Sequence, residues 1–259
     1  MPTISVITAI YNGGHHYLED TYRSLCEQQL PQGWSWQWCI QEDGATGIAN
    51  RHLPASDDRI SSGTGLSART GVARTMALSR ANGTFIRTLD ADDMLLPGAL
   101  ARDIERLQRS PWCTSACLDL LADGSTVAGP YDPVDGPLQQ RKFLHEHAAN
   151  QMSVQAVTLA AHTDLVRALG GWPALTGAET DGLLLAVEAV AAGEFIASPS
   201  LIYRKHAGQT TASSGYWAPD EIDTRFTAVQ QRARALYSSG WQWTGTVRST
   251  SPPAHQAAS

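Results

Sequence analysis

The stretch Thr88-Leu89-Asp90-Ala91-Asp92-Asp93-Met94-Leu95-Leu96 is the most informative part of the chain. Its three carboxylates follow the apolar run Phe85-Ile86-Arg87-Thr88-Leu89, which is typical of a buried strand. Acids gathered at the end of a strand repel one another unless a positive charge lies among them. Oxygen ligands suit Mg²⁺ or Mn²⁺, and Mg²⁺ usually shares its coordination shell with substrate phosphates. The stretch therefore indicates an enzyme that handles a phosphorylated substrate through a divalent cation. The alternative is that the acids only cap a following helix, but a cap needs one acid rather than three.

The first 110 residues alternate strand and helix. Strands are expected over Ile4–Ile10, Trp36–Gln41 and Phe85–Leu89, and helices over His15–Gln29, from a cap at Ser67 to Arg80, and from Pro97 to about Gln108. This alternation implies an α/β fold with a mostly parallel sheet and helices on both faces. Ligands of such sheets bind beyond the carboxyl ends of the strands. Tyr11-Asn12, Asp43-Gly44 and the acids Asp90 to Asp93 would therefore line one crevice.

The second half is less regular. Strands are expected over Thr114–Leu121, Gln155–Ala161 and Phe195–Tyr203, and helices over Leu138–Ala149, Glu179–Ala192 and Pro219–Tyr237. His145 and His147 are expected to face solvent. The last stretch, 244–259, is dominated by Ser, Thr, Pro and Ala and is expected to be a disordered tail.

Composition excludes several classes of protein. A net charge of −6 over 259 residues leaves no basic stripe for nucleic acid. No apolar run approaches the roughly 20 residues that span a bilayer, although peripheral contact with a membrane stays open. The start of the chain resembles a first strand rather than a signal peptide. The four cysteines lack metal-type spacing and are expected to be buried, reduced thiols of a cytoplasmic protein. Nothing in the sequence indicates an oligomeric state.

Six short motifs in one order resemble the family 2 glycosyltransferases. They are Val6-Ile7-Thr8-Ala9-Ile10-Tyr11-Asn12, Glu42-Asp43-Gly44-Ala45-Thr46, Gly71-Val72-Ala73-Arg74, Leu89-Asp90-Ala91-Asp92-Asp93, Gly170-Gly171-Trp172 and Tyr203-Arg204-Lys205-His206. The resemblance covers about residues 3 to 210. It implies a GT-A fold in one domain, with residues 1–110 as the nucleotide-sugar-binding half and 111–240 as the acceptor-binding, catalytic half. It also implies inverting transfer of a hexosyl-type sugar from a nucleotide-diphospho-sugar, with UDP as the expected nucleotide.

The resemblance also implies roles for residues of the donor site. Asp92 would bind the metal directly, Asp90 would contact the ribose or a metal-bound water, and His206 would reach the metal or the diphosphate. The remaining contacts to the nucleotide would come from Ala9, Tyr11, Asn12, Asp43, Arg74 and Ala91, and those to the diphosphate from Arg204 and Lys205. Two departures from the family are Ala9, where Pro is common, and Glu42, where Asp is usual. For Arg74 the alternative is a solvated helix arginine.

Two acids compete for the role of catalytic base. Inverting transfer needs a carboxylate that takes the acceptor proton, and the family places it in a Glu-Asp pair, whereas this chain has Glu179-Thr180-Asp181. Counting back from Gly193 favours Asp181, which we prefer, and counting forward from the Gly170-Gly171 turn favours Glu179. The alternative is that both acids only stabilise a helix N-terminus. Trp172 would form a platform for a sugar or acceptor, or else pack in the core.

Three functions follow from these observations. The favoured one is a metal-dependent glycosyltransferase that acts on a small molecule or glycan acceptor in polysaccharide or natural-product biosynthesis. The second is a sugar-phosphate nucleotidyltransferase, although the Gly-rich segment Tyr11 to His16 lacks the Arg or Lys usual there. The third is a catalytically impaired nucleotide-sugar-binding protein, suggested by the altered Glu-Asp pair.

Overall fold

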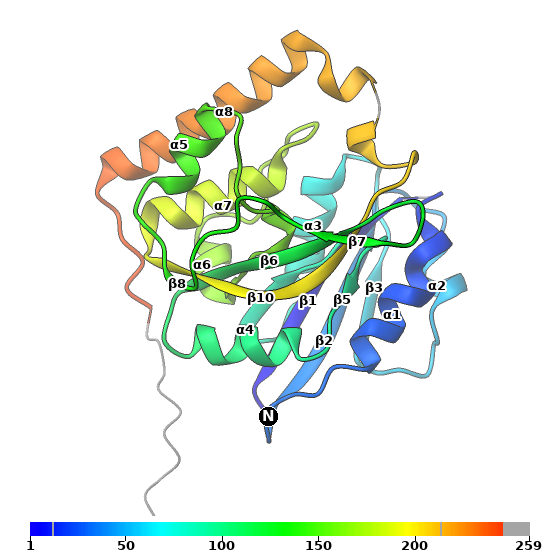
Figure 1. Ribbon diagram of the computed structural model, residues 1–259. Helices are drawn as coiled ribbons and strands as arrows, with labels where there is room; N and C mark the ends of the chain where they lie inside the picture. Colours follow the sequence, from blue (N-terminus) through cyan, green and yellow to red (C-terminus); the bar gives the residue numbers. More distant parts are fainter. Residues whose placement is uncertain (12, 213, 246–259) are drawn as a thin grey trace, which may run out of the picture.

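A single sheet runs through the whole computed structural model, which describes residues 1–11, 13–212 and 214–245. Its strands lie in the order β3-β2-β1-β4-β9-β6-β10-β5, with β7 added beside β6 and β8 beside β10 (Figure 1). The strands are β1 Thr3–Ile10, β2 Ser35–Glu42, β3 Ile60–Gly63, β4 Phe85–Thr88, β5 Met94–Leu95, β6 Trp112–Leu120, β7 Thr126–Ala128, β8 Gly136–Pro137, β9 Ala160–His162 and β10 Gly193–Arg204. The pairs β1–β2, β1–β4, β2–β3 and β6–β10 are parallel, and β9 joins the two groups as an antiparallel strand. The predicted α/β fold with a mostly parallel sheet is confirmed.

The central strand β1 shows why the sheet is covered on both faces. Side chains alternate across a strand, so Ile4, Val6 and Ile10 pack into one core cluster and Ile7 packs into the other. Six of the eight residues of β1 are buried, including the polar Ser5 and Thr8, as expected for a strand covered on both faces.

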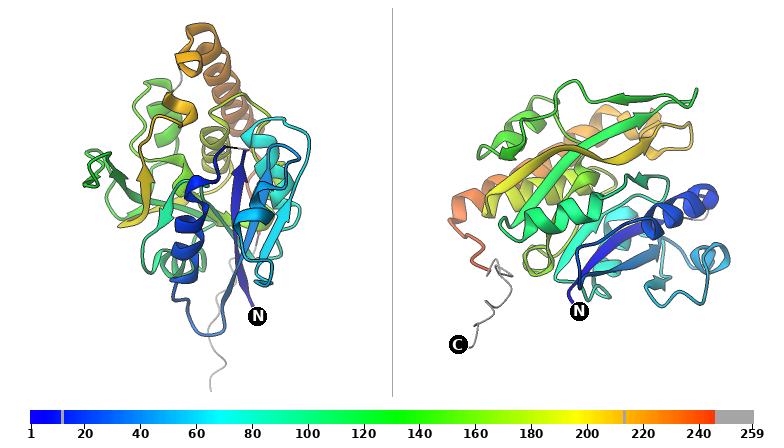
Figure 2. Two further views of the ribbon diagram at one scale, coloured as in Figure 1. Left: turned by 90° about the vertical axis from the view of Figure 1, so that its right-hand side faces the viewer. Right: turned by 60° about the horizontal axis from the view of Figure 1, so that its bottom comes forward.

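Helices cover both faces of the sheet (Figure 2). The first core cluster, which contains Ile4, Val6 and Ile10, receives side chains from α1 Leu18–Cys26, α2 Ile48–His52 and α4 Ala99–Leu107. The second core cluster, which contains Ile7, receives side chains from α3 Thr70–Leu78, α5 Lys142–Ala148, α6 Thr163–Ala168, α7 Glu179–Val190 and α8 Pro219–Ser239. None of the helices within the described ranges combines the length and the hydropathy needed to cross a bilayer.

Several predicted element boundaries were wrong. Helix α3 begins at Thr70, not after a cap at Ser67, because Asp43 binds the amides of the segment that precedes it. Helix α4 begins at Ala99, because Gly98 adopts a left-handed conformation (φ 73°) after Pro97.

The second half departs further from the predictions. The strand expected over 155–161 is a 3₁₀ turn, Ala156–Thr158, followed by the short β9, and the helix expected from Leu138 starts only at Lys142. His147 was expected in solvent but is buried beside the ring of Phe226. Cys26 is exposed, whereas the other three thiols are buried as expected. Beyond residue 245, the predicted tail lies outside the described residues.

Candidate functional site

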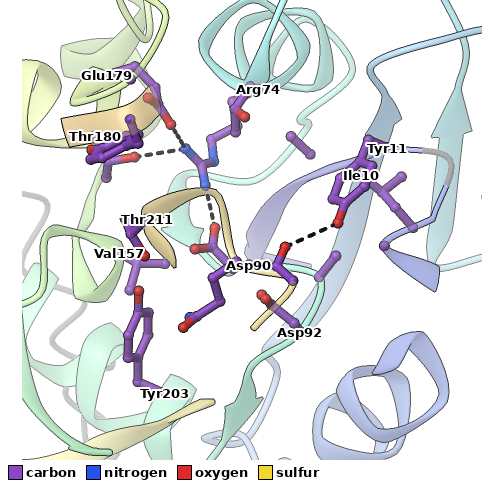
Figure 3. Close-up of a pocket in the computed structure, with 18 of the residues that line it drawn as sticks. Ile10, Tyr11, Arg74, Asp90, Asp92, Val157, Glu179, Thr180, Tyr203 and Thr211 are labelled. Atoms are coloured by element: carbon purple, nitrogen blue, oxygen red, sulfur yellow. Dashed lines mark hydrogen bonds and ion pairs between the residues drawn. The ribbon is translucent and has the colours of Figure 1, made fainter. Parts of the chain in front are cut away.

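A pocket of about 480 Å³ opens at the carboxyl ends of β1 and β4 and continues to the N-terminus of α7 (Figure 3). Residues of both halves of the chain line this pocket. Residues that line it include Ala9, Ile10, Tyr11, His16, Tyr17, Arg74, Asp90, Ala91, Asp92, Gln155, Val157, Glu179, Thr180, Asp181, Tyr203, His206, Thr211 and Tyr216. A pocket is therefore present at the strand ends where a crevice was predicted, and Tyr11, Asp90 and Asp92 line it, whereas Asp43 and Asp93 do not.

The three acids after β4 have different surroundings. Carboxylate oxygens of Asp90, Asp92 and Asp93 lie within 4.8 Å of one another. Asp93 is fully buried, where its Oδ1 accepts the backbone N–H of Arg204 at 2.9 Å. Burial, together with the charges of Asp90 and Asp92, raises the pKa of Asp93 well above its usual range. Asp92, in contrast, faces the pocket, and its Oδ2 lies 2.8 Å from Nε2 of His206.

These surroundings decide which groups could hold a divalent cation. Asp90 is already paired with Arg74, and Asp93 is turned into the protein to hold the backbone of Arg204. Within the described residues, the carboxylate of Asp92 and Nε2 of His206 are bonded only to each other, and both residues line the pocket. One carboxylate and one imidazole suit Mn²⁺ or Mg²⁺ when phosphate oxygens and water complete the shell. The residues present therefore fit the predicted metal.

Arg74 joins the two walls of the pocket. Its guanidinium donates to Glu179 Oε1 at 2.6 Å and to Thr180 Oγ1 at 2.8 Å, and its other terminal nitrogen donates to Asp90 (Figure 3). The side chain is only 4% exposed, so these contacts are made in a largely water-free environment. The alternative of a solvated helix arginine is wrong.

The two candidate bases differ in their partners. The turn before α7 places Ala178 in a left-handed conformation (φ 58°), and α7 then begins at Glu179. Glu179 is paired with Arg74, whereas Asp181 accepts no hydrogen bond from the described residues and faces the pocket. Burial, followed by the charge of Glu179, raises the pKa of Asp181 to about 7. A carboxylate with such a pKa is suited to proton transfer near neutral pH.

Asp43, which was expected to contact the nucleotide, does not line the pocket. It holds the segment before α3, with Oδ1 accepting the amides of Ala68 at 2.5 Å and Arg69 at 3.0 Å. Asn12 lies outside the described residues.

The two cations expected at the diphosphate also lie off the pocket. Arg204 donates from Nε to the backbone oxygen of Asp92 and pairs with Asp20 at 3.1 Å, while its guanidinium lies over the ring of Tyr17. Lys205 lies 3.4 Å from Asp119. Both charges are thus occupied by the protein's own acids in this structure.

Trp172 is 3% exposed in the second core cluster and lies outside the pocket, in agreement with the core-packing alternative. Other aromatic rings, Tyr203 and Tyr216, line the pocket instead. Tyr203 belongs to the Tyr-Arg-Lys-His motif, so the sequence offered a signal for it. Tyr216 and Thr211 lie in short 3₁₀ helices, and Gln155 directly precedes another. No sequence pattern indicated these three as site residues.

The fold and the pocket together define a GT-A type α/β domain, with acids at both ends of a cleft beyond the strands. Residues 5–117 match the model of the family described as glycosyl transferase family 2.

One curated relative is the Bacillus subtilis protein named teichuronic acid biosynthesis glycosyltransferase TuaG. It is 31% identical over 150 residues, which are 56% of this chain and 53% of TuaG. The chain thus spans about half the length of this relative.

The fold also matches solved structures of S. aureus TarS. TarS 1–349 in complex with UDP-GlcNAc aligns with a TM-score of 0.68 at 15% identity, over 92% of this chain and 71% of that one. TarS 1–349 in complex with UDP aligns with a TM-score of 0.62 at 14% identity, over 92% and 70%. At these identities the likeness shows the fold alone.

Proposed function

We propose that the protein is a metal-dependent, inverting glycosyltransferase that moves a sugar from a UDP-sugar to a hydroxyl group of a glycan or small-molecule acceptor. The observation that carries the proposal is one pocket with Asp92 and His206 at its donor end and Asp181 at its other end. The family match favours glycosyl transfer over nucleotidyl transfer.

The donor class is supported by the acids and by the solved relatives. When a nucleotide-diphospho-sugar transfers its sugar, the nucleoside diphosphate is the leaving group. A divalent cation held by Asp92 and His206 would act as a Lewis acid and neutralise the negative charge of this diphosphate. TarS, which shares the fold, has been solved with UDP-GlcNAc and with UDP. Backbone from Ala9 to Tyr11 lines the same end of the pocket and would lie beside the nucleoside.

Asp181 would act as the base. Its carboxylate accepts the proton of the acceptor hydroxyl while the oxygen forms a bond to the anomeric carbon. The bond from that carbon to the diphosphate oxygen breaks on the opposite side, so the configuration is inverted and the nucleotide diphosphate departs. Glu179 is less suited to this role, because its charge is already engaged by Arg74.

The pathway proposed is polysaccharide biosynthesis. The relative TuaG is named for teichuronic acid biosynthesis. Gln155, Thr176, Thr211 and Tyr216 line the pocket. Their hydroxyl and amide groups can form hydrogen bonds of the kind that sugar hydroxyls make.

The test is an incubation of the purified chain with single UDP-sugars, Mn²⁺ and a panel of oligosaccharide acceptors. Release of UDP together with an acceptor product of inverted anomeric configuration, observed by NMR, supports the proposal. A product with retained configuration would contradict the mechanism. Pyrophosphate release from UTP and a sugar phosphate, with no transfer from any UDP-sugar, would contradict the function.

A further inference from the structure

We infer that Arg74 is a positioning residue that sets the catalytic carboxylate of Asp181 against the donor end of the pocket, with Glu179 as its counter-ion rather than as a second base. The inference rests on the proposed function, because it assigns Asp181 the role of base. Arg74 acts through its neighbours and need not touch the substrate.

The first support is how Arg74 is bonded. Its contacts join Asp90, which follows β4, to Glu179 and Thr180, which form the first turn of α7. These partners lie 16, 105 and 106 residues away from Arg74 in the chain, so the guanidinium is a direct polar connection between the two halves of the domain. Asp181 is the next residue after Thr180, and a helical turn fixes its position relative to both bonded neighbours.

The second support is how closely α3 approaches α7. A Cβ added at Gly71 would lie 2.4 Å from the backbone oxygen of Pro173 and 3.1 Å from Cβ of Glu179. Gly71 and Arg74 are three residues apart and therefore lie on one face of α3. Because Gly71 has no side chain, α3 can approach α7 closely. The long side chain of Arg74 then reaches the first turn of α7 and bonds to it. No hydrogen-bonding cap from an N-cap side chain fixes this turn, because Ala178 occupies that position.

The third support is the balance of charge around Asp181. Glu179 lies on the same turn, Arg74 on α3, and Tyr216 and Arg225 pack from the side of α8, with Arg225 held over the ring of Tyr216. Arg74 neutralises Glu179, the anion nearest in sequence to Asp181. Without Arg74, this unneutralised charge would oppose the ionised form of Asp181.

The test compares Arg74→Met, Arg74→Lys, Glu179→Gln and the double variant Arg74→Met/Glu179→Gln. In Arg74→Met we expect transfer to fall by about 10²-fold, the cost typical of a displaced catalytic group. The acid limb of the pH profile of kcat/KM should move to higher pH, because Glu179 is left unneutralised. Glu179→Gln should move that limb to lower pH, and the double variant should return it toward the wild-type position. Arg74→Lys, which keeps the charge, should recover part of the rate.

Arg80→Met is the matched control. Arg80 follows the same helix and donates to Ile40 O and Gln41 Oε1, away from the pocket. We expect it to lower stability with no movement of the acid limb. If Arg74→Met does not fold, Glu179→Gln alone still decides the matter, because an acid limb unchanged from wild type would overturn the inference.

Hydrogen exchange separates failure of this inference from failure of the proposed function. The amides of residues 180–183 should exchange faster in Arg74→Met than in wild type or in Arg80→Met, whether or not the protein transfers sugar. Equal exchange in all three proteins would overturn the positioning role. An absence of transfer by wild type, with the exchange difference present, would instead contradict the function alone.

Discussion

Nε2 of His206 lies 2.8 Å from Oδ2 of Asp92, although 114 residues separate them in the chain. Nδ1 of the same imidazole accepts the backbone N–H of Gly208 at 3.2 Å. In a neutral ring, the proton is therefore on Nε2, which donates it to Asp92. Both residues line the pocket, and a cation bound by both side chains would replace this hydrogen bond.

This relationship predicts that UDP binding depends on the divalent cation and on both Asp92 and His206. Wild type should show a rise in melting temperature with UDP only when Mn²⁺ is present, since a ligand that binds the folded state stabilises it. Asp92→Asn and His206→Ala should each lose the Mn²⁺-dependent part of that rise. Asp119→Asn is the control, because Asp119 pairs with Lys205 and does not line the pocket. A full rise in Asp92→Asn, or in wild type with excess chelator, would rule out the metal site.

The second prediction concerns the pH dependence of transfer. Asp181 must be deprotonated to act as a base, and its pKa is raised to about 7. The rate should therefore be low at pH 5, rise through about pH 7, and level off above it. Asp181→Asn should lower kcat by about 10²–10⁴-fold, the usual contribution of a general base, while the rise in melting temperature with UDP stays. A flat pH profile between 5 and 8 would contradict the assignment.

The fold of the first half of the chain was predictable because local signals determine it. The apolar runs of β1, β2 and β4 and the acids at their ends are short-range patterns, and parallel strands necessarily place those ends along one edge. The predicted starts of helices α3 and α4 were wrong for two different reasons, a long-range contact in α3 and a local backbone conformation in α4. One helix start depends on Asp43, which lies more than twenty residues away, and the other on the left-handed conformation of Gly98.

The sequence could not reveal which charges are already paired. Arg204 and Lys205 stand in a motif and carry the right charge, yet their partners Asp20 and Asp119 are distant in the chain. Similarly, the choice between Glu179 and Asp181 depends on which of them Arg74 reaches, and that is a property of helix packing. Trp172 could not be assigned to pocket or core for the same reason.

A third prediction tests the buried ion pair between β4, an interior strand of the sheet, and α4. Arg87 and Asp103 are 0% and 1% exposed and lie 3.0 Å apart. Arg87→Met should lower the free energy of unfolding by about 3–5 kcal/mol, because it leaves a buried carboxyl without its partner. Urea unfolding measures this change. Arg87→Met/Asp103→Leu should recover much of the loss, and Arg109→Met, in a pair that is largely exposed, should change stability by less than about 1 kcal/mol. A loss below 1 kcal/mol in Arg87→Met would show that the pair is dispensable.

The last prediction tests the close approach of α3 to α7 by adding one methyl group. In Gly71→Ala the new Cβ would lie 2.4 Å from the backbone oxygen of Pro173, so the turn before α7 must move. We expect unfolding free energy to fall by about 1–3 kcal/mol, as for other overpacked sites. Transfer should fall as well under conditions where the variant is fully folded, because Asp181 moves with the turn.

Gly65→Ala is the control, since its Cβ would meet only Nε2 of Gln41, at an ordinary 3.5 Å. The measurements are urea unfolding and initial transfer rates for both variants. Wild-type rates in a folded Gly71→Ala protein would mean that the first turn of α7 tolerates displacement, and the close packing of α3 would then have no role in positioning the base.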